Sequence, residues 1–379
     1  MKKVCLFLII FFLFIGIVKA EDLAPNSKSA VILEQTTGEV LFEKNSHEKM
    51  APASMTKIMS LLLIMENIYK GNIKWDDIVT VSEKASSMGG SQILLETNEQ
   101  MKVEDLVKGI SIASGNDAVV AMAEYIAGSE ESFVKMMNAK AKSLNLKDTN
   151  FVNCHGLDTE GHYSSAYDMA IMARELIKYE KILKFTSIYE TYLRENTDRK
   201  IWLVNTNKLV RFKKGVDGLK TGYTKTAGYC LTATMKKNNM RLISTVMGCE
   251  SAKNRNADVS SMLDYGFNQY KAHNYLKKNK PVKTIKLSKA KKDKVAIIPM
   301  QDVNVVSKKN NKINPSYQIK LNNIKIPVKK GEIIGKLIVK NNGKKISTVD
   351  LTVASDIKKA NIIELYWNNI KKIITSNLN

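Results

Sequence analysis

The hydrophobic positions of the chain follow two different periods, and the change between them outlines a mixed α/β region. Two short β-rich runs, 29–35 and 39–43, flank the turn residues Thr36-Thr37-Gly38 and predict a hairpin. Apolar residues at helical spacing then predict a series of helices, at 54–70, 103–111, 117–127, 131–143 and 165–178. From Gly215 the period shortens and predicts three strands and a closing helix, at 216–223, 228–236, 240–248 and 256–270. Strands at both ends with helices between them predict an α/β sandwich, in which one antiparallel sheet combines both ends of the region.

Residues 282–355 carry a different pattern. Runs such as Lys336-Leu337-Ile338-Val339-Lys340 alternate with the two-residue period of half-exposed strands. Asn342-Gly343 is a strong signal for a tight hairpin turn. We therefore expect a first domain over residues 21–272 and a small all-β domain over residues 273–355.

The C-terminal segment, residues 356–379, returns to a helical pattern. Apolar and aromatic side chains gather on one face of this helix, namely Ile363, Tyr366, Trp367, Ile370, Ile373 and Ile374, and lysines lie around it. An amphipathic helix with aromatic residues at headgroup depth is typical of an interfacial membrane anchor. The alternative is a terminal helix that packs against its own domain.

The N-terminal segment, residues 1–20, resembles a secretory signal peptide. Lys2 and Lys3 precede an apolar run over residues 4–18, and Val18-Lys19-Ala20 resembles a cleavage site. The alternative is an uncleaved transmembrane anchor, but the run is shorter than the roughly 20 apolar residues that a spanning helix needs. We therefore expect an exported protein that works at the outer face of the cytoplasmic membrane or in the cell wall.

The charge is concentrated in the second domain. The whole chain has 59 Lys and Arg against 37 Asp and Glu, a net charge of +22, while residues 273–355 alone hold 20 lysines, no arginine and four acidic residues. Nucleic acid is a poor fit, because arginine is absent, the aromatics there are only Tyr275 and Tyr317, and the chain carries an export signal. Anionic wall polymers or lipid headgroups fit better, and a solvated lysine-rich surface is the alternative.

Cysteine and histidine give no sign of a disulfide framework, a metal or a cofactor. Cys5 lies in the leader, and the remaining three, Cys154, Cys230 and Cys249, are odd in number with no CxxC pair. The four histidines form no HExxH or other ligand cluster.

Ser54-Met55-Thr56-Lys57 is the first candidate for chemistry. Residues three apart on a helix share a face, so the Ser54 hydroxyl and the Lys57 amine lie within reach of each other. Free N–H groups at the helix start suit a developing oxyanion, and a lysine of lowered pKa can take the serine proton. The same spacing recurs elsewhere, at Ser46/Lys49, Ser132/Lys135, Ser288/Lys291 and Ser355/Lys358, so the motif alone is weak.

Two further motifs strengthen this candidate. Ser114-Gly115-Asn116 precedes a predicted helix, where its alternative interpretation is a simple N-cap. Lys220-Thr221-Gly222 lies on a predicted strand, which can present a lysine and a hydroxyl to a carboxylate, while the glycine lets a ligand lie close to the backbone. The three motifs in this order match the S-x-x-K, S-D-N-like and K-T-G signature of penicillin-binding proteins and serine β-lactamases.

The sequence resembles the low-molecular-mass penicillin-binding proteins that are serine D-alanyl-D-alanine carboxypeptidases. Beyond the three motifs, the resemblance rests on flanking residues over 29 to about 270, namely Pro52-Ala53, Val103-Glu104-Asp105-Leu106, Asp117-Ala118, His155-Gly156-Leu157, Gly218-Leu219 and Tyr223-Thr224. Lys330-Gly331-Glu332 and the terminal helix look like that family's β domain and membrane anchor. The resemblance implies the serine β-lactamase/transpeptidase-like fold, peptidoglycan stem pentapeptides as substrate and β-lactams as covalent inhibitors.

The resemblance also implies a role for each motif residue. Ser54 is the nucleophile, Lys57 its general base and Ser114 a proton relay. Substrate is held by Asn116, Lys220, Thr221, Gly222 and Tyr223, and the backbone N–H groups of Ser54 and Tyr223 form the oxyanion hole.

Two other functions remain open from the sequence. One is a serine β-lactamase, although the acidic E-x-x-L-N stretch of class A enzymes is not found between the second and third motifs. The other is a non-hydrolytic module that binds the wall or senses β-lactams.

Overall fold

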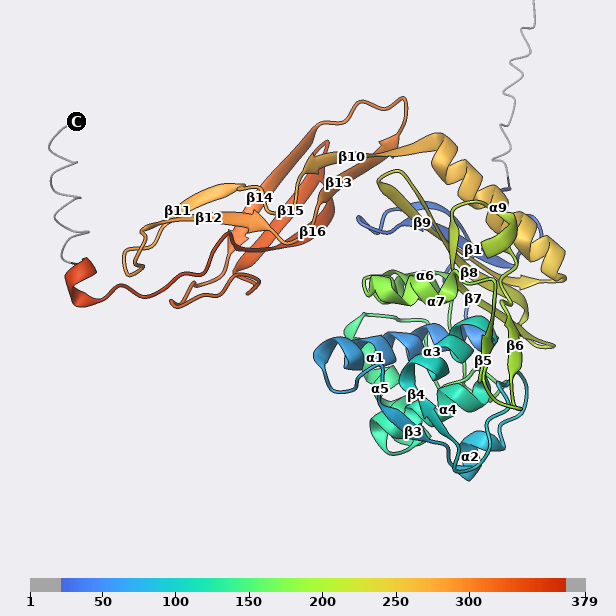
Figure 1. Ribbon diagram of the computed structural model, residues 1–379. Helices are drawn as coiled ribbons and strands as arrows, with labels where there is room; N and C mark the ends of the chain where they lie inside the picture. The colour runs from blue at the N-terminus through green and yellow to red at the C-terminus, as the bar shows by residue number, and fades with distance from the viewer. Residues whose placement is uncertain (1–21, 366–379) are drawn as a thin grey trace, which may run out of the picture.

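The first part of the chain is an α/β sandwich built around one antiparallel sheet. The computed structural model describes residues 22–365. The sheet has the order β2-β1-β9-β8-β7, from β1 (Ser29–Glu34), β2 (Val40–Lys44), β7 (Val216–Thr224), β8 (Gly228–Lys237) and β9 (Met240–Cys249). Strand β1 pairs with β9 over their whole common length, Ala30 opposite Val246. The two ends of the region thus meet in one sheet, as the sequence predicts, and the expected fold class is confirmed (Figure 1).

Helices cover both faces of this sheet. Alternate residues of β1 enter two separate cores: Val31 and Leu33 face the helical side, while Ala30 and Ile32 face α9 (Ala252–Gln269). The helical side contains α1 (Lys57–Lys70), α3 (Val103–Ile112), α4 (Asn116–Ala127), α5 (Glu130–Ser143) and α6 (Ala166–Leu176). Because β1 is buried on both faces, its central residues, 30–33, are all apolar and do not alternate with polar ones.

Side-chain caps fix where several helices begin. The Ser165 hydroxyl accepts a hydrogen bond from the Asp168 N–H at the start of α6, as is typical of an N-cap serine. Ser251 caps α9 in the same way, so that helix begins four residues before the expected Asn256. Several short elements were not expected, namely η1 (Ala53–Thr56), α2 (Glu83–Ser86), η2 (Glu180–Ile182), α7 (Leu183–Thr186), α8 (Leu209–Phe212) and the ribbons β3 (Ile78–Thr80) with β4 (Gln100–Lys102) and β5 (Glu190–Leu193) with β6 (Ile201–Val204).

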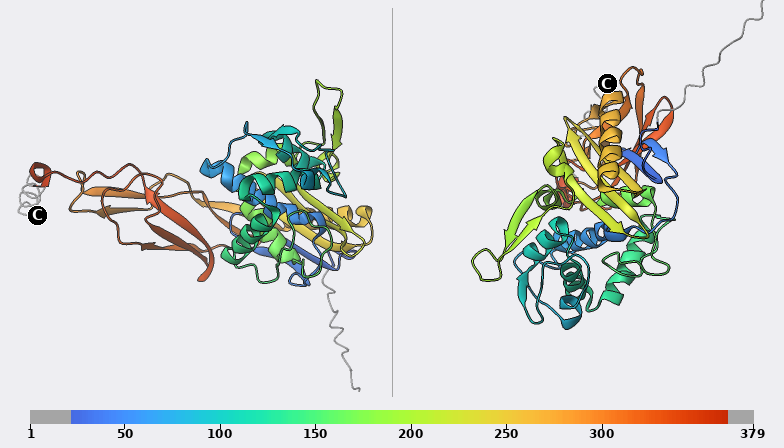
Figure 2. Two further views of the ribbon diagram at one scale, coloured as in Figure 1. Left: turned by 90° about the horizontal axis from the view of Figure 1, so that it is seen from below. Right: turned by 90° about the vertical axis from the view of Figure 1, so that its right-hand side faces the viewer.

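The second part is an all-β unit that extends away from the sandwich (Figures 1 and 2). A five-stranded sheet has the order β11-β12-β16-β15-β14, and β10 pairs with β13 beside it. The strands are β10 (Tyr270–Leu276), β11 (Lys283–Lys286), β12 (Lys294–Pro299), β13 (Val303–Lys308), β14 (Pro315–Leu321), β15 (Gly335–Asn341) and β16 (Lys344–Val353). Asn342 and Gly343 both adopt positive φ, 49° and 78°, in the turn between β15 and β16. Strand β10 continues directly from α9, so the expected boundary at residue 273 falls inside a strand.

The tail begins differently from the expected helix over 356–379. Residues 356–361 are extended, with Ile357 paired to Val328 and Lys359 to Ala290, and the helical turn begins only at Ile362. These bridges bury Ile357, which explains why helical spacing was misleading here. The rest of the expected anchor, residues 366–379, and the expected leader, residues 1–20, lie outside the described residues. Within residues 22–365 no helix has the length and apolar character needed to cross a bilayer.

Candidate active site

Ser54 and Lys57 meet at the start of α1. Ser54 lies in the 3-10 turn η1, and Lys57 is the first residue of the helix that follows. The Lys57 amine donates to the Ser54 hydroxyl at 3.0 Å, to Asn116 Oδ1 at 2.6 Å and to the His155 carbonyl at 2.7 Å. The side chain of Lys57 is fully buried, and this burial lowers the pKa of its amine to about 7. A neutral amine beside a partly exposed serine is therefore available at neutral pH.

Two glycines allow other segments to approach the Ser54 turn closely. Ala53 has a φ of +46°, an uncommon conformation for a residue with a side chain. A Cβ on Gly156 would lie 1.9 Å from the Ala53 carbonyl oxygen, and a Cβ on Gly222 would lie 2.6 Å from the Pro52 carbonyl oxygen. The sequence suggested that Gly222 makes room for a ligand. The structure gives a different reason, since the chain's own backbone occupies that space.

Ser114 and Asn116 lie at the connection between α3 and α4, and Asn116 contacts the same amine. Ser114 has a φ of +66°, and its hydroxyl is buried with no hydrogen-bond partner in residues 22–365. Asn116 donates from Nδ2 to the Gly89 carbonyl at 2.6 Å, which aims its Oδ1 at Lys57. The N-cap interpretation of Ser114 is wrong, because Gly115 is the N-cap of α4 and no side chain caps it.

Lys220 and Thr221 come from the edge strand β7. Lys220 is buried and donates to the Thr221 carbonyl at 3.0 Å, and the Thr221 hydroxyl donates to that of Thr206 at 2.7 Å. Burial, with help from the charges of Lys57 and Arg255, holds the pKa of Lys220 well below its usual range. Tyr223 is half-exposed at the end of the strand and packs on the ring of Tyr229. The structure thus brings the three predicted motifs together around one amine.

Arg255 is a site residue that sequence reasoning missed. It lies on α9, only 5% exposed, and its guanidinium donates to Asn256 Oδ1 at 3.1 and 3.0 Å. No carboxylate lies within ion-pair distance of it in the described part of the chain. A buried guanidinium without an acidic partner, close enough to Lys220 to lower its pKa, suits an anionic ligand. Nothing in its local sequence separates it from an ordinary surface arginine.

His155 supports the base through its backbone. Its carbonyl accepts from Lys57, and burial lowers the pKa of its own imidazole to about 4. The Leu157 N–H donates to the ring Nδ1 at 3.2 Å, so the ring is neutral and its Nε2–H faces Glu130 Oε1 at 3.4 Å. Glu130 also accepts from the Cys154 N–H at 3.2 Å, which ties α5 to the segment behind Lys57.

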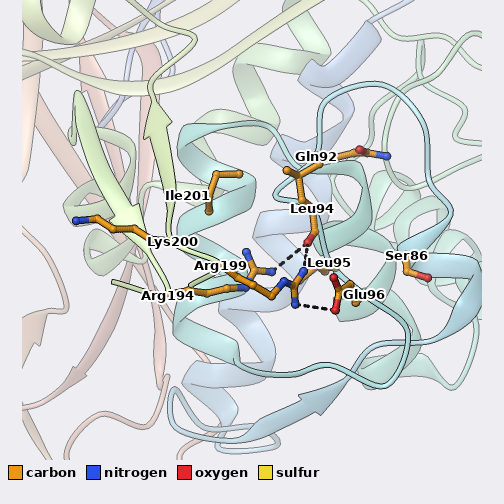
Figure 3. A pocket seen from close by; sticks show the side chains of 9 residues that line it. All are labelled: Ser86, Gln92, Leu94, Leu95, Glu96, Arg194, Arg199, Lys200 and Ile201. Carbon is orange, nitrogen blue, oxygen red and sulfur yellow. Dashed lines mark hydrogen bonds and ion pairs between the residues drawn. The ribbon is translucent and has the colours of Figure 1, made fainter. Parts of the chain in front are cut away.

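A second set of contacts lies beside the cavity drawn in Figure 3 and fixes the segment that holds Asn116. Arg194 donates to both carboxylate oxygens of Glu99, at 2.6 and 3.0 Å, and to the Ile93 carbonyl at 3.0 Å. The Asp117 carboxylate accepts from the Ile93 N–H on the other side. A cavity of about 450 Å³ lies beside this clamp, lined by Ser86, Gln92, Leu94, Leu95, Glu96, Arg194, Arg199, Lys200 and Ile201.

The remaining titratable side chains form no further centre of this kind in residues 22–365. No three of His, Cys, Asp and Glu are placed to hold a metal ion there. Cys154, Cys230 and Cys249 are free and buried, and burial raises their pKa.

Comparison with known proteins gives consistent matches for both parts of the chain. Residues 17–251 match the family described as D-alanyl-D-alanine carboxypeptidase, and residues 270–359 match the C-terminal domain of penicillin-binding protein 5. The chain is 54% identical to the D-alanyl-D-alanine carboxypeptidase DacF of Bacillus subtilis, over 91% of this chain and 89% of DacF.

Solved structures agree with this. Penicillin-binding protein 5 from Haemophilus influenzae is 32% identical with a TM-score of 0.70, covering 88% of this chain and 98% of that one. Penicillin-binding protein D2 from Listeria monocytogenes in its ampicillin-bound form is 30% identical with a TM-score of 0.57, covering 64% and 98%.

Proposed function

The chain belongs to the D-alanyl-D-alanine carboxypeptidase family, and from this premise we propose which of its residues perform the reaction. It is a serine D,D-carboxypeptidase that removes the terminal D-alanine from peptidoglycan stem pentapeptides through an acyl-enzyme, and β-lactams acylate it. The observation that carries the residue assignment is the 3.0 Å contact between the buried Lys57 amine and the Ser54 hydroxyl.

In the acylation step, Ser54 Oγ attacks the carbonyl carbon of the penultimate D-alanine while its proton passes to the neutral Lys57 amine. The negative charge that develops on the carbonyl oxygen is held by the backbone N–H groups of Ser54 and Tyr223. Asn116 Oδ1 and the His155 carbonyl keep the Lys57 amine aimed at Ser54 as it gains the proton. The energetic advantage is that these acceptors are already in place before the charge appears.

Breakdown of the tetrahedral intermediate then releases D-alanine. The C–N bond breaks, and the leaving amine takes a proton from the Lys57 ammonium through the Ser114 hydroxyl. Burial of Ser114 Oγ without a hydrogen-bond partner in the described residues leaves it free for this relay. In the second half-reaction, water attacks the ester carbon and gives a proton to Lys57. The C–O bond to Ser54 Oγ then breaks, and Lys57 returns that proton to Ser54 Oγ, which restores the alcohol.

Lys220, Thr221 and Arg255 bind the terminal carboxylate of the substrate. All three are buried, and a carboxylate bound among them gains charge-assisted hydrogen bonds that water does not weaken. An incoming carboxylate also favours the protonated form of Lys220, offsetting the burial that lowers its pKa.

The test of this assignment is covalent labelling. Ser54→Ala should abolish both D-alanine release and labelling by a fluorescent penicillin, because Ser54 is the one hydroxyl among the hydrogen-bond partners of the Lys57 amine in residues 22–365. Ser132→Ala, which alters another serine with a lysine three residues later, serves as the matched control and should label normally. Labelling that persists in Ser54→Ala would contradict the assignment.

The site of action follows from the chain's ends. Peptidoglycan, the family's substrate, lies outside the cytoplasmic membrane, and the signal-peptide pattern of residues 1–20 fits export. The apolar stripe of the tail suits insertion at a bilayer surface. The mature protein therefore works at the outer face of the cytoplasmic membrane, held by the part of its tail beyond Leu365.

A further inference from the structure

One face of the five-stranded sheet in the β unit carries lysines opposite lysines. On β15, Leu337 and Val339 face the core, so Lys336 and Lys340 point to the other side. Lys320 of β14 lies directly opposite Lys336, and Lys345 of β16 lies directly opposite Lys340. We call Lys320, Lys336, Lys340 and Lys345 the lysine face.

Like charges directly opposite each other on neighbouring strands destabilise a sheet. The face contains one acidic residue, Asp350, which lies across from Lys336 on β16, and no ion pair involves any of its four lysines in the described residues. A further pair of the same kind, Lys286 and Lys294, joins β11 to β12 in the same sheet. Asp350 relieves part of the repulsion at Lys336, but the other like-charge pairings cost stability in the isolated protein, and a bound polyanion would offset that cost.

The arrangement of the lysines suits a linear partner. Each directly opposed pair has its Cβ atoms about 5 Å apart, and the two pairs lie about 13 Å from each other along β15. The side chains between them on this face are small or polar, apart from the half-buried Ile338, so nothing is shaped to enter a bilayer. A flexible chain of closely spaced anionic groups can follow both pairs at once.

The lysine face also borders a cleft that the catalytic sandwich helps to line. Thr348 and Asp350, on the same side of β16, line a cleft of about 990 Å³ between the two parts of the chain. Lys236 and Arg241 of the sandwich line the same cleft, along with Lys278 of the β unit. A polymer on the face would therefore run beside the enzyme and not away from it.

We propose that the lysine face binds a linear phosphate-bearing polymer of the cell envelope. The binding is electrostatic, by ammonium groups whose spacing along and across the strands follows the polymer, and it holds the catalytic unit near its substrate. The catalytic residues take no part in this binding, so the binding proposal can be tested separately from the proposed catalytic assignment.

The test compares two triple variants of the full mature chain with equal loss of charge. Lys320→Gln, Lys336→Gln and Lys340→Gln remove three of the four lysines of the face and break both opposed pairs. The control replaces exposed lysines elsewhere in the unit, Lys283→Gln, Lys309→Gln and Lys325→Gln. The probe is linear inorganic polyphosphate, with its affinity measured at several salt concentrations. Vesicles of phosphatidylglycerol and phosphatidylcholine form a second arm, and hydrolysis of a small D-Ala-D-Ala peptide checks that each variant is folded.

The face variant should bind polyphosphate at least about tenfold more weakly than the control variant at low salt. The slope of log affinity against log salt should shrink by about 2, because each lost phosphate contact contributes roughly 0.7. The face variant should also melt at a higher temperature than wild type, since it loses the opposed charges. Equal losses in both variants would overturn the proposal, as would a face variant impaired on vesicles but not on polyphosphate, which would assign the face to lipid.

Discussion

At the scale of single residues, the site depends on an amine that is buried yet has two fixed oxygen acceptors besides the Ser54 hydroxyl. Burial lowers the pKa of Lys57 to about 7, so a large share of the amine is uncharged at neutral pH, while Asn116 Oδ1 and the His155 carbonyl stabilise the proton that it gains during acylation. Placing a lysine of ordinary pKa at the same point would leave it protonated and unable to accept a proton.

The pKa of Lys57 gives a direct prediction for the pH profile. Because the neutral amine is the active form and its pKa is about 7, acylation should rise about tenfold per pH unit below 7 and level off above it. Lys57→Ala should lower the rate by about 10²–10⁴-fold and remove this dependence. The measurement is the second-order rate of labelling by a fluorescent penicillin between pH 5 and 9, with thermal unfolding as the control. A wild-type profile that is flat through pH 7 would place the base elsewhere.

Lys220 and Arg255 should both bind the terminal carboxylate of the substrate. Replacing either by Ala should lower kcat/KM for a peptide with a free carboxylate by about 10- to 150-fold, since a charge-assisted hydrogen bond is worth about 1.5–3 kcal/mol. A peptide with an amidated C-terminus is the matched substrate, and it should lose much less. Equal losses on the two peptides would show that these cations do not contact the carboxylate.

Site residues that belong to a sequence motif could be predicted from the sequence. Those that contribute a backbone group, or that lie far away in the sequence, could not. Ser54, Lys57 and Lys220 belong to motifs whose spacing implies proximity. The His155 contribution is a backbone carbonyl, which leaves no trace in residue type, and Arg255 acts from a helix 35 positions beyond Lys220. Such contacts depend on how α9 packs against the sheet, and periodicity alone does not define that.

At the scale of elements, the position of the nucleophile depends on the close packing of the loop at Gly156 against η1. Periodicity predicted the long helices and the sheet strands well, because each has one or two buried faces. It missed β5 and β6, which have only four residues each, and β10, where half-buried polar residues blur the alternation. The tight turns around Ser54 were also missed, since backbone packing of this kind has no periodic signal.

Gly156→Ala should therefore disrupt the site from outside it. The new Cβ would lie 1.9 Å from the Ala53 carbonyl oxygen at a φ of +91°, so the turn that carries Ser54 must move. Gly161→Ala is the matched control, because it also has positive φ, +77°, but its nearest neighbour would be 3.8 Å away. We expect the control to lose about 1 kcal/mol and keep normal acylation, while Gly156→Ala loses both stability and acylation. Similar behaviour of the two variants in melting and penicillin labelling would contradict the packing argument.

At the scale of the whole molecule, the chain combines a catalytic sandwich with a basic β unit that carries the described tail at its far end (Figure 1). The order of the two domains, the fold class and the enzyme family could all be predicted from the sequence. The spacing of hydrophobic residues, the net charge and the motifs all change together along the chain. The carboxypeptidase family is favoured over the β-lactamase alternative, because the match to the relative DacF extends over both the sandwich and the β unit. The prediction that the tail is helical from residue 356 was wrong, since β-bridges from Ile357 and Lys359 to neighbouring loops outweigh the helical spacing of its apolar residues.

Those bridges divide the tail into a structural part and the part that we propose as the anchor, and truncation should separate them. A chain ending at Leu365 keeps Ile357 and Ala360 buried, so it should leave the membrane fraction while retaining wild-type melting and small-peptide hydrolysis. A chain ending at Ser355 should also be released but melt at a lower temperature, because its β unit loses these contacts.

High salt should release little of the full-length protein from the membrane, since each buried aliphatic side chain is worth about 1.5–3 kcal/mol and salt does not weaken that hydrophobic contribution. If salt alone releases the full-length protein, or the Leu365 chain stays bound, the lysines of the β unit hold it at the membrane and the tail beyond Leu365 does not.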